Sequence, residues 1–249
     1  KTQILNFTSA NAPDLTNWYA ANRMTPFVDA GLFEDVSDLW AEDEFVNNLA
    51  STKGALTLDG KQWGIPYTYY QWGVYYREDI FKELGLTEPT TWAEEKANCG
   101  KIVASGRACY TIGTKYLWTA GGWFDYVNLR TNGYDFHVQL ANGEIAWTDP
   151  RVRQTFANWR ELIDMGAFVE NHQTSSCQES LPFIVNGDAA ASLIGNFAVA
   201  PLREAGLSDD KLDFYQFVSI NPDVAMAEDA PTDTFHIPSL AKNKENAKE

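Results

Sequence analysis

The sequence predicts an α/β fold in which strands and helices alternate along the chain. Extended apolar or aromatic runs are followed by stretches with helix-capping residues, and this order indicates mixed layers, not separate all-α and all-β parts. With 249 residues, of which 45% are hydrophobic, the chain can form one large domain or two modest ones. The sequence has no internal repeat, no low-complexity tract and no Gly/Ser linker between independent domains.

The first elements expected are a short strand over residues 14–18 and a helix over residues 22–30. Gly31 would end this helix, because glycine readily takes the left-handed conformation that follows many helices. Residues 35–40 and the acidic residues 42–44 open another helix, with the acids at its positive N-terminal end.

The segment 59–92 is the most informative stretch of the sequence. A polar turn at residues 59–61 leads into an aromatic extended run over residues 63–76, which Pro66 interrupts. A buried central strand would be β-branched and would avoid proline. We therefore expect this run to be backbone at the edge of a crevice, where rings can face a ligand. A helix over residues 78–84 follows.

Two further helices are predicted from capping boxes, in which a Ser or Thr and the Glu three residues later satisfy each other's backbone N–H groups. Thr91 and Glu94 begin a helix that runs to about residue 104, and Ser176 and Glu179 begin a second one.

Another helix begins at Asp149-Pro150, since the Asp side chain can cap it and proline suits the first helical position. Gly166 would end it. Its apolar stripe consists of Val152, Phe156, Trp159, Leu162 and Ile163. Further strands are expected over residues 109–112, 189–194 and 212–220.

The two ends of the chain predict little structure of their own. Asn243 is a helix-cap residue, yet only a short polar stretch follows it, and a helix that short without an apolar stripe would not hold itself together. Residues 1–7 begin without a cap or turn. We therefore expect a chain truncated at both ends.

The composition argues against several kinds of partner. A net charge of −15 argues against nucleic acid, whose phosphates need clustered Lys and Arg, and against an anionic membrane surface. The longest apolar runs fall short of the ~18 residues that a membrane-spanning helix needs.

Three cysteines give an odd count. Cys99 and Cys109 lie ten residues apart, so a disulfide between them in an oxidising compartment is left open, with Cys177 alone. None of the three has the spacing of a metal site, and no cofactor is expected.

The sequence lacks the motifs of several enzyme classes. Its three histidines form neither an i, i+4 pair nor an HExxH motif, no GxSxG motif is present, and Gly121-Gly122 is too short to cradle a phosphate. A glycoside-processing enzyme with a carboxylate pair stays the alternative function, because thirty-four acidic residues can always supply two. Nothing sets one acid apart in an aromatic pocket, so we predict a binding protein and not an enzyme.

Residues 12–33 and 59–92 together carry a resemblance to a known family. The chain resembles the solute-binding proteins of ABC sugar importers, the group typified by maltodextrin-binding protein, over essentially its whole length. The resemblance implies a two-lobed periplasmic-binding-protein type II fold with a ligand cleft between the lobes. Lobe 1 would comprise residues 1–70 and 230–249, and lobe 2 residues 71–229.

The function that this resemblance implies is transport without chemistry. Such a protein binds a mono- or oligosaccharide between its lobes, closes by a hinge motion and delivers the sugar to a membrane ABC permease. A monomer in the periplasm or outside the cell is expected, and a lipid anchor on the full-length protein is left open. The identity, length and linkage of the sugar are open as well.

In lobe 1 the resemblance places Trp18 at the end of a strand that faces the ligand. Asn22 and Arg23 stand where the family has an Asp-Arg pair that hydrogen-bonds sugar hydroxyls. Asn in place of Asp keeps an acceptor and removes a charge. An indole face can cover the apolar C–H side of a pyranose, and a guanidinium suits vicinal hydroxyls. The alternative is that Trp18 is core and Arg23 a solvated residue.

At the crossings between lobes, Tyr70 stands where the family has a carboxylate that contacts sugar, and Trp72 follows at the same crossing. The alternative for Tyr70 is packing under the hinge. Asp233 begins the return crossing and could contribute a carboxylate.

In lobe 2, residues 115–135 match the family's aromatic cleft helix, which offers Trp118 and Trp123 as ring platforms. Because these two are five positions apart, they cannot share one helix face with their aromatic neighbours, and some of these rings must be core. Phe197 stands where the family stacks a ring on the sugar, and Asn196 precedes it as a hydrogen-bonding residue.

Overall fold

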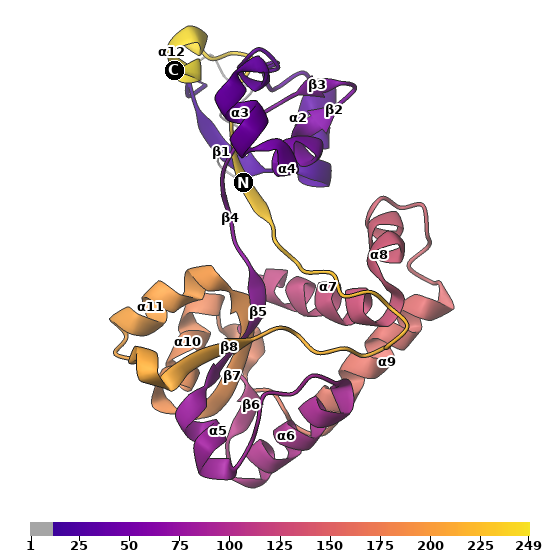
Figure 1. Ribbon diagram of the computed structural model, residues 1–249, viewed down its shortest axis with the longest axis vertical. Helices are drawn as coiled ribbons and strands as arrows, with labels where there is room; N and C mark the ends of the chain where they lie inside the picture. Colours follow the sequence, from indigo (N-terminus) through magenta and orange to yellow (C-terminus); the bar gives the residue numbers. More distant parts are fainter. Residues whose placement is uncertain (1–11) are drawn as a thin grey trace. The chain divides into compact units, whose positions relative to one another are not determined.

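The computed structural model of the chain describes residues 12–249 (Figure 1). The chain forms two compact units, which are described separately. Unit 1 comprises residues 1–70 and 230–249, and unit 2 comprises residues 71–229. The expectation for residues 1–7 lies outside the described residues.

Unit 1 is built on a three-stranded antiparallel sheet of order β1-β9-β4. The strands are β1 (Thr16–Tyr19), β4 (Ile65–Tyr69) and β9 (Thr232–His236). The central strand β9 comes from the end of the chain and pairs with two strands from its beginning. Pro66 lies on the edge strand β4, where a missing backbone N–H costs no ladder hydrogen bond.

Short helices and one hairpin cover this sheet. The helices are η1 (Ala21–Arg23), α2 (Thr25–Asp29), η2 (Leu39–Ala41), α3 (Asp43–Asn48), α4 (Ala50–Lys53), η3 (Gly54–Leu56) and α12 (Lys244–Lys248), and the hairpin strands are β2 (Thr57–Leu58) and β3 (Lys61–Gln62). Their core includes Met24, Phe27, Phe33 and Trp40. The single helix predicted over residues 22–30 is wrong in extent. Pro26 lies in the first turn of α2, because proline is tolerated only at a helix start, and η1 precedes it as a separate turn.

Helix α12 was not expected to be stable, and ion pairs explain why it forms. Lys244 lies 2.6 Å from Glu34, and Lys248 lies 2.7 Å from Asp38. Asn243 does not cap the helix; its side chain donates to Asp14 instead, at 2.8 Å. Ion pairs to residues distant in sequence therefore stabilise α12, although the helix has no apolar stripe.

Unit 2 contains a four-stranded sheet of order β6-β7-β5-β8. Its strands are β5 (Trp72–Arg77), β6 (Ala108–Tyr110), β7 (Ala189–Gly195) and β8 (Leu212–Tyr215). β5 pairs antiparallel with β7 on one side and β8 on the other, while β6 runs parallel to β7. The strand predicted over residues 212–220 is therefore too long.

The prediction that the aromatic run avoids a central strand is wrong for its second half. All six residues of β5 are buried inside the sheet. Burial of Tyr76 in this strand is tolerated because its polar end finds a partner: the Tyr76 hydroxyl donates to Glu88 at 2.8 Å. Gly73 leaves room for the ring of Phe214, which would lie 2.3 Å from a Cβ at that position.

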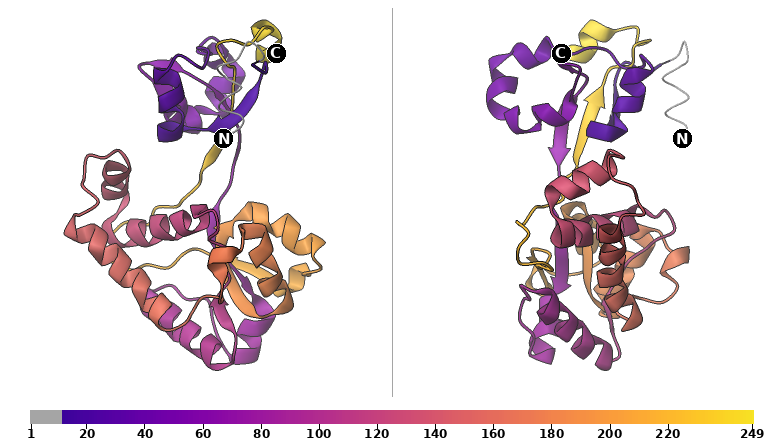
Figure 2. Two further views of the ribbon diagram at one scale, coloured as in Figure 1. Left: turned by 180° about the vertical axis from the view of Figure 1, so that it is seen from behind. Right: turned by 90° about the vertical axis from the view of Figure 1, so that its right-hand side faces the viewer.

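Helices surround the sheet of unit 2 (Figures 1 and 2). They are α5 (Glu78–Leu84), α6 (Trp92–Ala104), α7 (Trp118–Asn132), α8 (Tyr134–Ala141), α9 (Pro150–Asp164), η4 (His172–Thr174), α10 (Cys177–Asn186), η5 (Asn196–Ala198), α11 (Val199–Glu204) and η6 (Asp209–Lys211). Both predicted capping boxes are confirmed, at the starts of α6 and α10. None of the helices in residues 12–249 has the length and apolarity to span a bilayer.

The apolar stripe predicted for α9 is only partly correct. Leu162 is buried, but Phe156 and Ile163 are 48% and 49% exposed. The buried face carries Thr155 instead, whose hydroxyl donates to Asn128 of α7 at 2.9 Å. Because such buried polar groups satisfy one another, α7 and α9 pack through a hydrogen-bonded seam that a hydropathy pattern does not show.

The disulfide that the sequence left open is present, between Cys99 on α6 and Cys109 on β6. It joins a helix to the sheet of unit 2. Cys177 is buried and has a free thiol.

Candidate functional site

Three aromatic rings meet in unit 2 where β5, α7 and β7 end or begin. We call Trp72, Trp118 and Phe197 the three-ring cluster. The ring centroids of Trp72 and Trp118 are 6.0 Å apart at 85°, those of Trp72 and Phe197 6.2 Å apart at 73°, and those of Trp118 and Phe197 6.0 Å apart at 55°. Each ring therefore contacts both others, which is an arrangement favoured by aromatic quadrupoles.

The three rings differ in exposure. Trp72 is 4% exposed and forms the base of the cluster, whereas Trp118 is 42% exposed and Phe197 is 41% exposed. Two partly open rings on a buried third ring make a surface on which the apolar face of a small ligand can stack.

Two glycines allow Trp72 to lie at the base of this cluster. A Cβ on Gly122 of α7 would lie 2.3 Å from the Trp72 ring, and a Cβ on Gly195 of β7 would lie 2.3 Å from the Phe197 ring. Any larger residue at either position would push a ring out of place. Gly122 of the Gly121-Gly122 pair thus serves close packing, while a Cβ on Gly121 would meet no atom within 4 Å.

The indole N–H of Trp72 is buried and has no hydrogen-bond partner within residues 12–249. This nitrogen lies beside Gly195, 3.1 Å from where a Cβ would be. An indole N–H can only donate, and a buried donor without an acceptor costs about 1–3 kcal/mol. The base of the three-ring cluster therefore offers a donor that a ligand oxygen could satisfy.

Of the residues predicted in lobe 2, the structure brings together Trp72, Trp118 and Phe197, with Asn196 exposed beside them. Trp123 does not join them. It is fully buried, edge-on to Tyr110, and stacked on the ring of a tryptophan of α9, so it is a core residue and its predicted ligand contact is corrected.

In unit 1, Arg23 lies over aromatic rings that end strand β1. Its guanidinium carbon is 3.8 Å from the ring centroid of Tyr19 and 5.9 Å from that of Trp18. Trp18 is half-buried, packs edge-on against Phe27 and donates its indole N–H to the Arg23 carbonyl at 2.9 Å. Asn22, the residue before Arg23, is exposed. Trp18 thus belongs partly to the core, while Arg23 and Asn22 are open to solvent.

Asp233, on the central strand β9, is flanked by two phenols. The hydroxyl of Tyr70 donates to one carboxylate oxygen at 3.3 Å and that of Tyr67 to the other at 3.5 Å. The sequence predicted Tyr70 and Asp233 as candidates but missed Tyr67. Its ring is 46% exposed and stacks on Phe235, a contact set by strand pairing.

The sequence also missed two carboxylates of unit 2, Asp125 and Asp229. Trp118, Gly122 and Asp125 are spaced by four and three positions on α7, and this spacing puts them on one helix face. Burial and the charge of Asp229 raise the pKa of Asp125 to about 7. Burial and the charge of Glu228 raise the pKa of Asp229 to about 6. The helical spacing from Trp118 was the signal that could have found Asp125.

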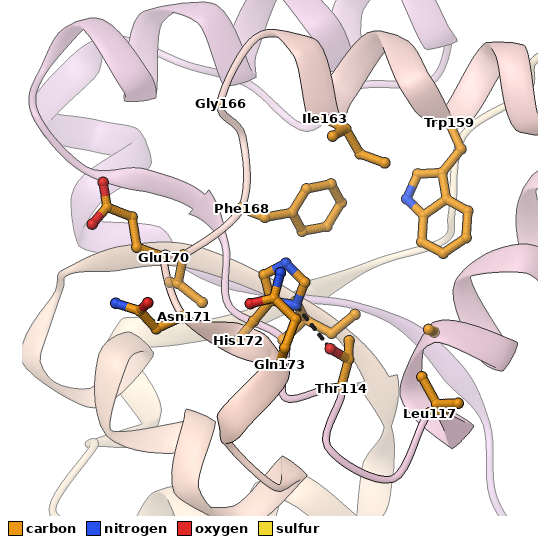
Figure 3. A pocket seen from close by; sticks show the side chains of 13 residues that line it. Thr114, Leu117, Trp159, Ile163, Gly166, Phe168, Glu170, Asn171, His172 and Gln173 are labelled. Atoms are coloured by element: carbon orange, nitrogen blue, oxygen red, sulfur yellow. Dashed lines mark hydrogen bonds between the residues drawn. The ribbon is translucent and has the colours of Figure 1, made fainter.

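A separate cavity of about 600 Å³ lies in unit 2 beside the start of α7 (Figure 3). Trp159, Ile163 and Phe168 form apolar walls, and His172 and Gln173 lie at the opposite side. The Thr114 hydroxyl is 2.8 Å from Nδ1 of His172, and burial lowers the pKa of this histidine. The cavity suits an uncharged, largely apolar group.

Glu95 is the one fully buried carboxyl among the groups of residues 12–249 with a shifted pKa. The hydroxyls of Tyr110 and Tyr215 donate to it, the latter at 3.0 Å. It lies close to the sulfurs of Cys99 and Cys109, but these are joined in the disulfide and cannot ligate a metal ion. Glu95 is therefore part of the core of unit 2.

Glu95→Gln is expected to make stability less dependent on pH. Burial, partly offset by the tyrosine hydrogen bonds, raises the pKa of Glu95 from 4.5 to about 7. A group with a raised folded-state pKa contributes stability that is complete below its unfolded pKa and is lost as the pH rises through the folded one. The loss between pH 4.5 and pH 7 is about 3 kcal/mol. Urea unfolding of both proteins at a series of pH values measures it.

The matched control is Glu204→Gln, which removes an exposed carboxylate of α11. It should leave the pH profile of the free energy of unfolding parallel to wild type. A parallel profile for Glu95→Gln as well would mean that the buried carboxyl titrates normally.

Comparison with known proteins places the chain in a family. Residues 2–249 match the bacterial extracellular solute-binding proteins. The chain belongs to this family. The family expected from residues 12–33 and 59–92 is thus confirmed, and so is the fold class, since the solved structures that the chain resembles are two-lobed solute-binding proteins.

Among curated relatives, the multiple sugar-binding protein of Streptococcus mutans is 23% identical over 213 residues, which are 82% of this chain and 49% of that protein. Among solved structures, the bacterial solute receptor AcbH, with an exclusive preference for β-D-galactopyranose, is 32% identical with a TM-score of 0.84, over 94% of this chain and 60% of that one. A protein of xylan utilization from Caldanaerobius polysaccharolyticus is 20% identical with a TM-score of 0.91, over 99% of this chain and 64% of that one.

The chain therefore spans about half to two thirds of the length of these proteins. The family and the solved neighbours are substrate-binding receptors and not enzymes.

Proposed function

We propose that this chain binds a saccharide and that the full-length protein delivers it to the permease of an ABC transporter. The observation that carries the proposal is the three-ring cluster of unit 2, with two partly exposed rings over a buried indole whose N–H lacks an acceptor. The likeness to a galactopyranose receptor at 32% identity supports it.

The chemistry of the cluster suits a pyranose. One face of a sugar ring carries C–H groups that stack on aromatic faces, and its edge carries hydroxyls that need donors and acceptors. Trp118 and Phe197 supply the faces, while the Trp72 N–H and the Asn196 amide supply polar contacts. Binding by such groups holds a ligand without changing its covalent bonds.

Units 1 and 2 correspond in this proposal to the two lobes predicted from the sequence. Unit 1 would contribute the polar side chains of Asn22, Arg23, Tyr70 and Asp233, together with the exposed part of Trp18. Tyr70 and Asp233 are already hydrogen-bonded to each other, which orients the carboxylate. The protein would act as a monomer outside the cytoplasm, consistent with an extracellular family.

The deciding experiment is a titration of tryptophan fluorescence of the full-length protein with D-galactose, raffinose, xylo-oligosaccharides and chitin oligosaccharides. The chain has nine tryptophans, and Trp72 and Trp118 report directly on the cluster. A saturable change with one sugar that is recovered chemically intact supports the proposal. Conversion of the sugar would show that the protein is an enzyme and overturn the proposal. No fluorescence change with any of the four ligands would contradict saccharide binding.

Arg23→Ala is expected to weaken binding of that sugar several-fold without a change in melting temperature. Arg23 is exposed and bonded to the core only through backbone and ring contacts, so its side chain is free to donate to a ligand. Isothermal titration calorimetry measures the affinity. The control is Arg160→Ala, another exposed arginine, in an i, i+4 pair on α9; an equal effect of both variants would mean that only net charge matters.

A further inference from the structure

One face of α7 continues from the three-ring cluster to a carboxylate. Trp118 is a member of the cluster, Gly122 receives the ring of Trp72, and Asp125 follows within the next turn. The side chain of Asp125 is 38% exposed. The face of α7 that supports the rings therefore ends in a carboxylate that solvent or a ligand can reach.

Asp229, which is distant in sequence from α7, contacts the backbone of Trp72. Its carbonyl accepts the backbone N–H of Trp72 at 3.2 Å, and the Trp72 carbonyl in turn accepts the hydroxyl of Tyr126 at 2.6 Å. Tyr126 is the residue after Asp125. Asp229 itself, and Tyr126 next to Asp125, are thus hydrogen-bonded to the backbone of Trp72.

Within residues 12–249, neither carboxylate has a cation or a hydrogen-bond donor. The nearest charged partner of Asp125 is His137 of α8, whose Nε2 is 3.8 Å away, beyond hydrogen-bonding distance. The other ring nitrogen of His137 is 3.1 Å from the Asn128 amide, and burial lowers its pKa, so this histidine is neutral near pH 7.

The one buried guanidinium nearby is already used. Arg130 of α7 pairs with Glu228 at 2.6 Å, and the Gln216 amide also donates to Glu228. The Tyr126 hydroxyl oxygen lies 3.0 Å from the same carboxylate. Asp229, the next residue, forms no ion pair with Arg130 within residues 12–249. The titratable groups that act on Asp125 are therefore His137 and Asp229, and Glu228 acts in turn on Asp229.

A second observation points to a ligand independently of these acids. Trp72 is 4% exposed and its indole N–H has no acceptor, although it lies at the base of the adjacent ring surface. A saccharide offers an acceptor for the indole N–H and a donor for the carboxylate, because each hydroxyl can both accept and donate a hydrogen bond.

We propose that Asp125 is a specificity-determining residue, whose carboxylate accepts hydrogen bonds from hydroxyls of the saccharide stacked on Trp118 and Phe197, and that binding expels a proton from this carboxyl group. This inference rests on the proposed function. The proton passes to the buffer, and no bond of the sugar is made or broken. Charge-assisted hydrogen bonds of this kind are stronger than neutral ones, so the ionised carboxyl is the form that binds.

The electrostatics agree with a proton held near neutral pH. Burial and Asp229 raise the pKa of Asp125 to about 7, and burial and Glu228 raise that of Asp229 to about 6. Hydroxyl donors favour the ionised carboxylate and lower the pKa in the complex. The apparent affinity should therefore increase as the pH rises from 5.5 to 7.5, by at most about tenfold per pH unit, and level off above.

The experiment is calorimetry of the full-length protein with D-galactose and with raffinose. Titrations at pH 6.5 in three buffers of different ionisation enthalpy give the number of protons released per ligand. We expect on the order of half a proton at pH 6.5 and close to none at pH 8.5, where the pair is already ionised. The same measurements are made on Asp125→Asn and on the control Asp135→Asn, which removes an exposed acid of α8.

Asp125→Asn should lose the proton release and the pH dependence and bind the sugar at least several-fold more weakly, with an unchanged circular dichroism spectrum. Asp135→Asn should keep all three properties of the wild type. Sugar binding without proton release, or with affinity that falls as the pH rises, would overturn the inference and leave the proposed function standing. Absence of binding to both sugars by the wild type would overturn the two together.

Discussion

Replacement of Arg130 by methionine is expected to lower the free energy of unfolding by about 3 kcal/mol. The arginine side chain is 1% exposed. It donates to the carbonyls of Phe217 and Ala227 and to the carboxylate of Glu228. Methionine fills a similar volume but removes the donor of two carbonyls and the cationic partner of Glu228, and a carboxylate that loses its buried partner is strongly destabilising.

Urea unfolding followed by circular dichroism measures this loss, and Arg160→Met is the matched control. Arg160 forms an exposed pair with Asp164 on α9, and such pairs contribute about 0.5 kcal/mol or less. Arg130→Lys should restore little of the stability, because an ammonium cannot reproduce the three directed hydrogen bonds of the guanidinium. A loss as small as that of the control would show that the segment 217–228 does not depend on this arginine.

The helix boundaries predicted best are those set by local chemistry. α5, α6 and α10 begin or end at capping boxes or at a glycine with positive φ, and these contacts involve residues within four positions of each other. Gly85, for example, takes φ +63° at the end of α5. A sequence displays such signals completely, since both partners are adjacent in it.

The errors arise where a distant segment decides the outcome. β5 is a central strand because β7 and β8 pair with it. The sequence of residues 72–77 does not indicate that two strands from residues 189–215 pair with this segment. Thr155 of α9 is buried because Asn128 meets its hydroxyl. Tertiary hydrogen bonding overrides hydropathy in both elements.

The candidate site divides in the same way. The resemblance to a family placed Trp118 and Phe197, and the structure brings their rings together. It could not separate Trp123 from them, because burial by Tyr110 is a property of the folded core. The sequence analysis missed Asp125 because burial and the neighbouring Asp229, which raise its pKa, are properties of the folded chain.

Trp118→Ala and Phe197→Ala are each expected to weaken saccharide binding by about 1–2 kcal/mol, roughly five- to thirtyfold in the dissociation constant. Each ring is about two fifths exposed, so its removal takes away a stacking face at little cost to the core. The double variant should lose less than the sum of the two effects, because both rings contact one ligand and each other at 6.0 Å.

Calorimetric titration with the sugar that the fluorescence titration identifies measures the four affinities of this cycle, and thermal unfolding checks that each variant is folded. Tyr134→Ala is the control, since it removes an exposed ring of α8 outside the three-ring cluster. Its affinity should equal that of the wild type. If Phe197→Ala binds as tightly as the control but melts well below it, Phe197 is a packing residue, because its ring would then stabilise Trp72 against Gly195 and contribute nothing to the ligand.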